Sequence, residues 1–138
     1  MTEPAVPGPE GAKPSGLLLS RDLIFTSKIT GTARSLGYRV VVAGDVALAS
    51  AMIERDRPRA VFVDLTAGDL VGVPALLAYR QAAGPDATFV AFGPHVDVSA
   101  LENARSTGCQ VVLPRSKFSA ELPEVIRAAF GGPGDPGG

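Results

Sequence analysis

Apolar residues along the chain gather in five short runs that are separated by longer segments of mixed character. The runs lie at residues 17–19, 39–42, 60–63, 88–92 and 110–113. Short continuous runs rich in Val, Leu and Phe, in place of strict apolar–polar alternation, are typical of strands that are buried on both faces. The pattern therefore predicts five buried strands.

The segments between the runs carry apolar residues at helical spacing. In the first segment Phe25, Ile29, Ala33 and Leu36 follow one another at steps of four, four and three, and Gly37 comes next as a C-terminal stop. Similar spacing recurs in four later segments. We therefore expect five helices, one after each strand.

Capping residues predict where some of these helices begin. Asp45 and Asp97 stand before two of the helical segments, where an aspartate side chain can accept a hydrogen bond from a free amide. Pro74 fits the first turn of the third helix. We expect Ser119 to cap the last helix, and Pro123 leaves the start of that helix open.

The alternation of strands and helices predicts a fold class. Parallel neighbours need crossover connections, and right-handed crossovers place helices over both faces of the sheet. We therefore expect a three-layer α/β sandwich of the flavodoxin-like, doubly wound kind, with a five-stranded parallel sheet and five helices. Sites in such sheets lie beyond the carboxyl ends of the strands, here at residues 20–23, 64–68, 93–96 and 114–117.

The two ends of the chain differ in composition from its middle. Residues 1–15 and 131–138 are rich in Pro and Gly and carry few large apolar side chains. Such segments bury too little surface to offset the entropy of ordering, so we expect both to be disordered tails. One domain is then expected between them, at residues 16–130.

Composition narrows the classes of function. The chain has 138 residues, 46% of them hydrophobic, with 13 Lys and Arg against 14 Asp and Glu. This balance does not favour nucleic-acid binding. No run reaches the roughly 18 apolar residues that would cross a membrane. A single cysteine, Cys109, fits a reducing compartment, so we expect a cytoplasmic protein.

Asp64 is the strongest candidate for chemistry, because it ends the apolar run 60–63 and a carboxylate there is costly to bury without partners. Gly72 follows eight residues later, and the segment 108–116 reads GCQVVLPRS. With these elements in this order, residues 16–130 resemble a receiver domain of bacterial two-component response regulators. The resemblance implies a role in phosphorelay signal transduction.

The resemblance implies that Asp64 stands at the position of the phosphorylated aspartate. It also implies a Mg²⁺ ion, held by two acidic residues after the first strand, and here Ser20 and Arg21 stand at those positions, with Asp22 next. We expect the Arg21 guanidinium to repel Mg²⁺ and to pair with Asp64. The alternative is a purely structural Asp64 that is buried, is bonded to backbone N–H groups or to Arg21, and has no signalling role.

Other positions also depart from the pattern of the family. Gly93 stands where the resemblance implies a hydroxyl residue after the fourth strand. Arg115 replaces the expected lysine, and Val112 replaces the aromatic residue that changes rotamer on phosphorylation. The chain thus resembles a pseudo-receiver. We expect no enzymatic activity, no cofactor and no metal ion, and any metal would fall at Asp22 and Asp64.

We expect the chain to act through protein–protein interaction, with a protein partner or a second copy. The expected face comprises the fourth helix, the fifth strand and the fifth helix, where Arg105, Arg115 and Lys117 lie. The main alternative is a working receiver that is phosphorylated on Asp64 with Mg²⁺. A small flavodoxin-like enzyme or ligand binder is a third possibility, for which the sequence offers no motif.

Overall fold

The computed structural model describes residues 15–131 of the chain. The predicted tails lie outside the described residues, except that Ser15 begins the first strand and Gly131 ends the last helix. In the described part no helix is long and apolar enough to cross a membrane.

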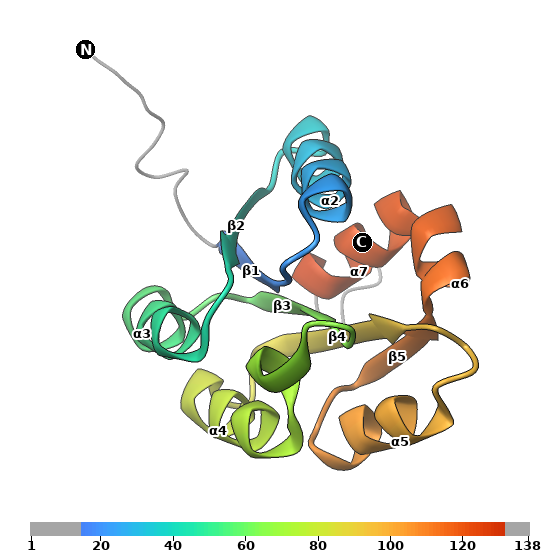
Figure 1. The fold of residues 1–138 in the computed structure, drawn as a ribbon. Coiled ribbons are helices and arrows are strands. Elements are labelled where there is room, and N and C mark those ends of the chain that lie inside the picture. Colours follow the sequence, from blue (N-terminus) through green and yellow to red (C-terminus); the bar gives the residue numbers. More distant parts are fainter. Residues whose placement is uncertain (1–14, 132–138) are drawn as a thin grey trace.

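A five-stranded parallel sheet forms the centre of the molecule, as predicted (Figure 1). Its order is β2-β1-β3-β4-β5, so β2 and β5 are the edge strands. All residues of the three inner strands are buried, which explains why these strands read as continuous apolar runs. The strands are β1 (Ser15–Leu19), β2 (Arg39–Ala43), β3 (Ala60–Asp64), β4 (Thr88–Gly93) and β5 (Val111–Pro114).

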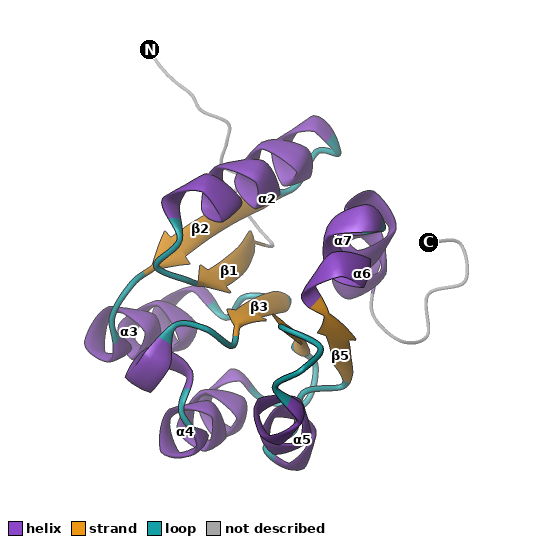
Figure 2. Ribbon diagram, turned by 45° about the vertical axis from the view of Figure 1, so that its right-hand side comes forward, coloured by secondary structure: helices purple, strands orange, loops and turns teal. Residues whose placement is uncertain are grey.

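Helices cover both faces of the sheet, which gives the predicted three layers (Figure 2). One face is covered by α2 (Leu23–Ser35), α6 (Arg115–Ala120) and α7 (Leu122–Gly131). The other face is covered by α3 (Val46–Asp56), α4 (Val73–Ala83) and α5 (Val98–Ser106), and the short 3-10 helix η1 (Gly68–Val71) precedes α4.

The segment after β5 differs from the prediction. It forms two helices in place of one, so the described residues contain six α-helices. Pro123 has no amide hydrogen and its ring would clash with the preceding turn, so α6 ends before Glu121 and α7 starts at Leu122. Ser119 therefore does not cap the last helix. It lies inside α6, where its Oγ accepts a hydrogen bond from Lys28 at 2.6 Å.

The helix starts confirm two of the expected caps. Asp45 and Asp97 accept hydrogen bonds from the third amide beyond them, at 2.8 and 3.2 Å, and Pro74 lies in the first turn of α4. Asp22 caps α2 in the same way, which the sequence analysis did not foresee. Gly37 ends the α2 segment with a φ of 91°, a left-handed conformation that favours glycine.

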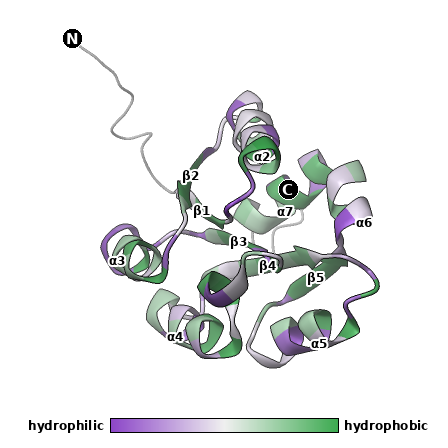
Figure 3. Cartoon of the chain, viewed as in Figure 1, coloured by the Kyte–Doolittle hydropathy of each residue, from purple (hydrophilic) through white to green (hydrophobic). Residues whose placement is uncertain are grey.

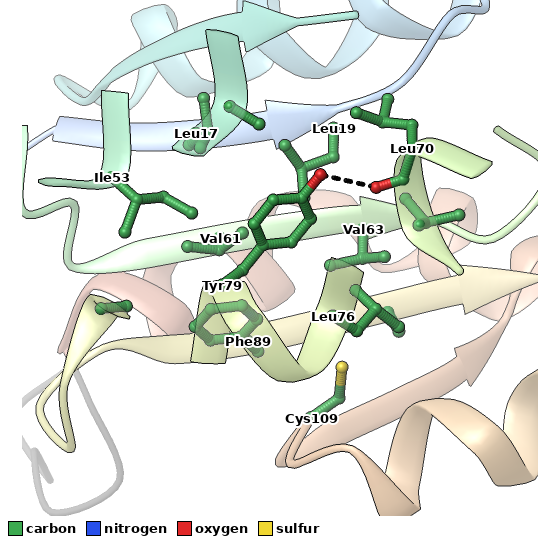
Figure 4. Close-up of a cluster of buried hydrophobic side chains, with 14 of the residues drawn as sticks. Leu17, Leu19, Ile53, Val61, Val63, Leu70, Leu76, Tyr79, Phe89 and Cys109 are labelled. Carbon is green, nitrogen blue, oxygen red and sulfur yellow. Dashed lines mark hydrogen bonds between the residues drawn. The ribbon is translucent and has the colours of Figure 1, made fainter. Parts of the chain in front are cut away.

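Two apolar clusters, one on each face, hold the layers together, and hydrophobic residues follow the strands (Figure 3). Tyr79 of α4 is buried in one of them and donates its hydroxyl hydrogen to the carbonyl of Leu70 at 2.7 Å (Figure 4). On the other face the rings of Phe92 and Phe118 stack with centroids 4.0 Å apart. Both clusters reach the carboxyl ends of the strands, so they support the loops there.

Burial of Cys109 predicts a slow reaction with thiol reagents. Its side chain lies in the cluster of Figure 4, and burial raises the pKa of the Cys109 thiol to about 11. At pH 8 the thiolate fraction is then about a hundredfold or more below that of an exposed cysteine. We expect labelling of the native protein to be slower than labelling in denaturant by at least this factor. Equal rates would contradict the burial.

Candidate functional site

The carboxyl ends of β1, β3, β4 and β5 bring together the residues that the sequence singled out. Ser20 follows β1, Asp64 ends β3, Gly93 ends β4, and Arg115 follows β5. Because these strands are parallel neighbours, their ends meet along one edge of the sheet.

Asp64 is the centre of this edge and is closed off from solvent. Its side chain is 1% exposed. The Oγ of Ser20 donates a hydrogen bond to Oδ2 at 2.7 Å. The amide and the hydroxyl of Thr66 donate to Oδ1 at 3.0 and 2.7 Å. Both carboxylate oxygens are therefore held by neutral donors that come from the two adjoining loops.

Ser20 connects Asp64 to the start of α2. Its side chain is buried, and its Oγ also accepts a hydrogen bond from the amide of Asp22 at 3.2 Å. The hydroxyl hydrogen is thus directed at Asp64 while the oxygen receives a backbone donor. This arrangement fixes the course of the chain between β1 and α2.

The expected pairing of Arg21 with Asp64 is wrong. The Arg21 side chain donates from Nε to the carbonyl of Gly44 at 2.9 Å and from Nη1 to the carbonyl of Ala67 at 3.0 Å. Nη1 also pairs with Asp69 at 3.2 Å. Ser20 is directed at Asp64, whereas the next side chain, Arg21, is directed at the loops after β2 and β3. Arg21 instead ties together the loops after β1, β2 and β3.

Asp22 and Arg115 form a second tie across the edge. Arg115 Nη2 lies 2.9 Å from Asp22 Oδ2, and its guanidinium stacks 4.4 Å above the Phe25 ring. The other oxygen of Asp22 accepts the Phe25 amide at 3.0 Å. The hydrogen bond from the Phe25 amide, and then that from Arg115, lower the pKa of Asp22 below its ordinary value of 3.8. Arg115 is therefore engaged with Asp22 and not with Asp64.

Leu65 occupies the space beside Gly93. A Cβ atom added at Gly93 would lie 3.1 Å from Cβ of Leu65 and 3.4 Å from its Cδ1. The Leu65 amide donates to the Phe92 carbonyl at 2.9 Å, so the Leu65 backbone is held by the ladder between β3 and β4. Gly93 thus makes room for an apolar side chain where the resemblance implies a hydroxyl group.

Thr66 is the residue of this site that sequence reasoning missed. A signal was present, because a hydroxyl residue two positions after an aspartate is suited to a local turn in which the carboxylate accepts both donors. His95 and Ser116 lie at the same edge, and both are exposed.

The residues at this edge do not fit a Mg²⁺ ion. Mg²⁺ prefers carboxylates and water, whereas Asp64 is surrounded by the hydroxyls of Ser20 and Thr66 and by a backbone amide. Within residues 15–131 no group of three His, Cys, Asp or Glu side chains is placed so that it could hold a metal ion. Asp22, the other expected ligand, is committed to a helix cap and to Arg115.

Replacement of glycine by alanine is predicted to have opposite effects on stability at Gly93 and at Gly31. Gly93→Ala should lower the free energy of unfolding by about 1–3 kcal/mol, because the added methyl meets Leu65. Gly31 lies in α2 with open space around it, so Gly31→Ala should raise stability by up to about 1 kcal/mol. Urea unfolding measures both values. A neutral or stabilising Gly93→Ala would contradict the overlap.

The Asp22 contacts predict a pH dependence of stability. Because the folded pKa of Asp22 is lowered, its contribution is present above the ordinary value of 3.8 and is lost as the pH falls through the lower folded value. Asp22→Asn keeps a helix-capping side chain and removes the charge. We expect this variant to be less stable than the unsubstituted protein at pH 7, with the difference vanishing in acid. Asp86→Asn, at an exposed position before β4, is the control and should show no such difference.

Comparisons with known proteins agree on the fold alone. No protein-family model and no curated protein matches the chain. Among solved structures, the receiver domain of a sensor histidine kinase from Pseudomonas aeruginosa, with a magnesium ion in its active-site cleft, is similar at a TM-score of 0.71 and 24% identity. The match covers 86% of this chain and 98% of that one.

Two further receiver domains have the same architecture. That of NtrX from Brucella abortus matches at a TM-score of 0.73 and 20% identity, over 84% of this chain and 98% of that one. The beryllofluoride-activated NtrC4 receiver dimer matches at a TM-score of 0.66 and 17% identity, over 82% of this chain and 96% of that one. The described residues therefore have the fold of response regulator receiver domains, at low sequence identity.

Proposed function

We propose that this chain is an atypical receiver-like signalling module that acts by binding another protein, without ordinary phosphorylation of its strand-end aspartate and without enzymatic activity. The observation that carries the proposal is the closure of Asp64. Its carboxylate is buried, and both oxygens accept short hydrogen bonds from Ser20 and Thr66.

Phosphorylation of Asp64 would require a nucleophilic oxygen and a cation to neutralise the transferring phosphoryl group. The oxygens are occupied by donors on both sides. Each arginine near this edge is engaged elsewhere, Arg21 with the loop carbonyls and Asp69, and Arg115 with Asp22. Neither guanidinium is hydrogen-bonded to Asp64, so neither arginine supplies positive charge directly at the carboxylate.

The parts that would report a phosphoryl group are also replaced. Gly93 has no hydroxyl that could hydrogen-bond a phosphoryl group, and Leu65 fills the adjacent space. Val112 is partly buried and packs against the cluster of Figure 4, so no aromatic side chain stands at the position of the family's rotamer switch. The ties made by Arg21 and Arg115 hold the loops in one arrangement, which suits a module that presents a constant surface.

The face of α5, β5 and the two helices α6 and α7, which replace the predicted fifth helix, is a candidate docking surface for a protein partner. Arg105 is exposed on α5, as the sequence analysis expected. Arg115 and Lys117 are partly neutralised within the chain, by Asp22 at 2.9 Å and by Glu121 at 3.5 Å. A partner at this face would therefore meet less positive charge than the sequence suggests.

A phosphodonor experiment tests the proposal. The full chain is incubated with a small phosphodonor and Mg²⁺ beside a phosphate-accepting receiver, and intact masses are measured. We expect an adduct on the reference receiver and none on this chain. An adduct that Asp64→Asn removes would establish the alternative, a phosphoaccepting receiver. Because Asp64→Asn also alters the buried hydrogen bonds, circular dichroism must show that the variant is folded.

A further inference from the structure

Strand β2 forms one edge of the sheet and is apolar except for Arg39. Strand β2 reads RVVVA, contains no proline, and has no charged residue after Arg39. Val42 is 38% exposed although it belongs to the sheet. Edge strands of proteins that stay monomeric are usually blunted by charges, proline or cover, because they present unpaired backbone groups to other chains. The edge at β2 has little such protection.

The opposite edge is better protected. In β5 every residue is partly buried, none is exposed, and the strand ends at Pro114. Proline cannot donate a ladder hydrogen bond. The strands β2 and β5 form the two edges of the sheet (Figure 1), and β2 is the less protected of the two.

Further exposed apolar side chains lie where β2 ends. Helix α3 begins with Val46 shortly after β2, and Val46 and Leu48 are 37% and 45% exposed. Leu23 and Ile24, in the first turn of α2, are exposed beside the end of the neighbouring strand β1. Exposed apolar side chains thus follow the carboxyl ends of both β1 and β2.

The charges flanking this patch are complementary under two-fold symmetry. Arg39 at one end of β2 and Asp45 beyond the other end are both exposed. Asp45 lies two residues beyond β2, at a bend before α3, with φ −143° and ψ 161°, and its Oδ1 accepts the Leu48 amide at 2.8 Å. An antiparallel pair of β2 strands with Val42 opposite Val42 places Arg39 opposite Asp45 twice, because these residues are each three positions from the axis.

We propose that the chain forms a homodimer in which the β2 strands of two copies pair antiparallel about Val42, giving one continuous sheet of ten strands. Each Arg39 then lies opposite the Asp45 of the other copy, three positions from the axis. This inference goes beyond the proposed function and does not depend on the chemistry of Asp64.

Cross-linking tests the register of this pair. Directly opposed residues have Cα atoms about 4.5–5.5 Å apart, within the range that a disulfide spans, so Val42→Cys should cross-link under mild oxidation. Val40→Cys is the matched control on the same strand. Its two copies would be roughly 14 Å apart and should not cross-link. The native Cys109 is buried and should leave the unsubstituted protein unlinked.

Sedimentation measures the dimer itself. We expect the full chain to form a dimer whose dissociation constant rises at least tenfold in Val42→Lys and in Arg39→Glu. Leu77→Lys, at an exposed apolar position on α4, should leave it unchanged. Circular dichroism establishes that each variant is folded, and the Arg39→Glu variant carries the test if Val42→Lys does not fold.

Three results would overturn the proposal: a monomer up to millimolar concentration, a dimer that neither folded variant weakens, or cross-linking of Val40→Cys in place of Val42→Cys. A failure here leaves the phosphodonor result unaffected, because that experiment measures the mass of the chain and not its association.

Discussion

The buried carboxylate of Asp64 is the constraint on which the site depends. A carboxylate taken from water without partners is very costly, and removing a single partner of a buried polar group costs on the order of 1–3 kcal/mol or more. Here the cost is offset by three donors from Ser20 and Thr66. Because those donors lie in different loops, the need to satisfy Asp64 also fixes where the chain leaves β1 and β3.

Arg21 and Arg115 also connect the loops at this edge. Arg21 joins three loops through carbonyl oxygens and Asp69, and Arg115 joins the start of α6 to the cap of α2. Guanidinium groups suit this work because their planar donors point in several directions at once. The positively charged side chains of Arg21 and Arg115 therefore connect the loops at this edge.

Unlike the closed edge around Asp64, other parts of the surface expose apolar side chains. The centre of the sheet is covered by helices on both faces, whereas the β2 edge exposes Val42 and the start of α3 exposes Val46 and Leu48. The exposed part of these side chains, 37–45% of each residue, does not help the isolated fold, because it stays in water. Their contribution to free energy would come only on association, and this separates the parts of the chain that hold the fold from those that are free to bind.

The apolar runs and helical spacings by themselves determined the five parallel strands, their order along the chain and the layered architecture, because burial on both faces leaves a continuous apolar signal. The caps at Asp45 and Asp97 were equally readable, since capping is local. Tertiary structure alone decided that Arg21 turns away from Asp64, that Arg115 binds Asp22, and that Leu65 fills the space at Gly93. The sequence could not predict these contacts, because each side chain has several possible partners. The folded loops decide which of those partners lie within reach.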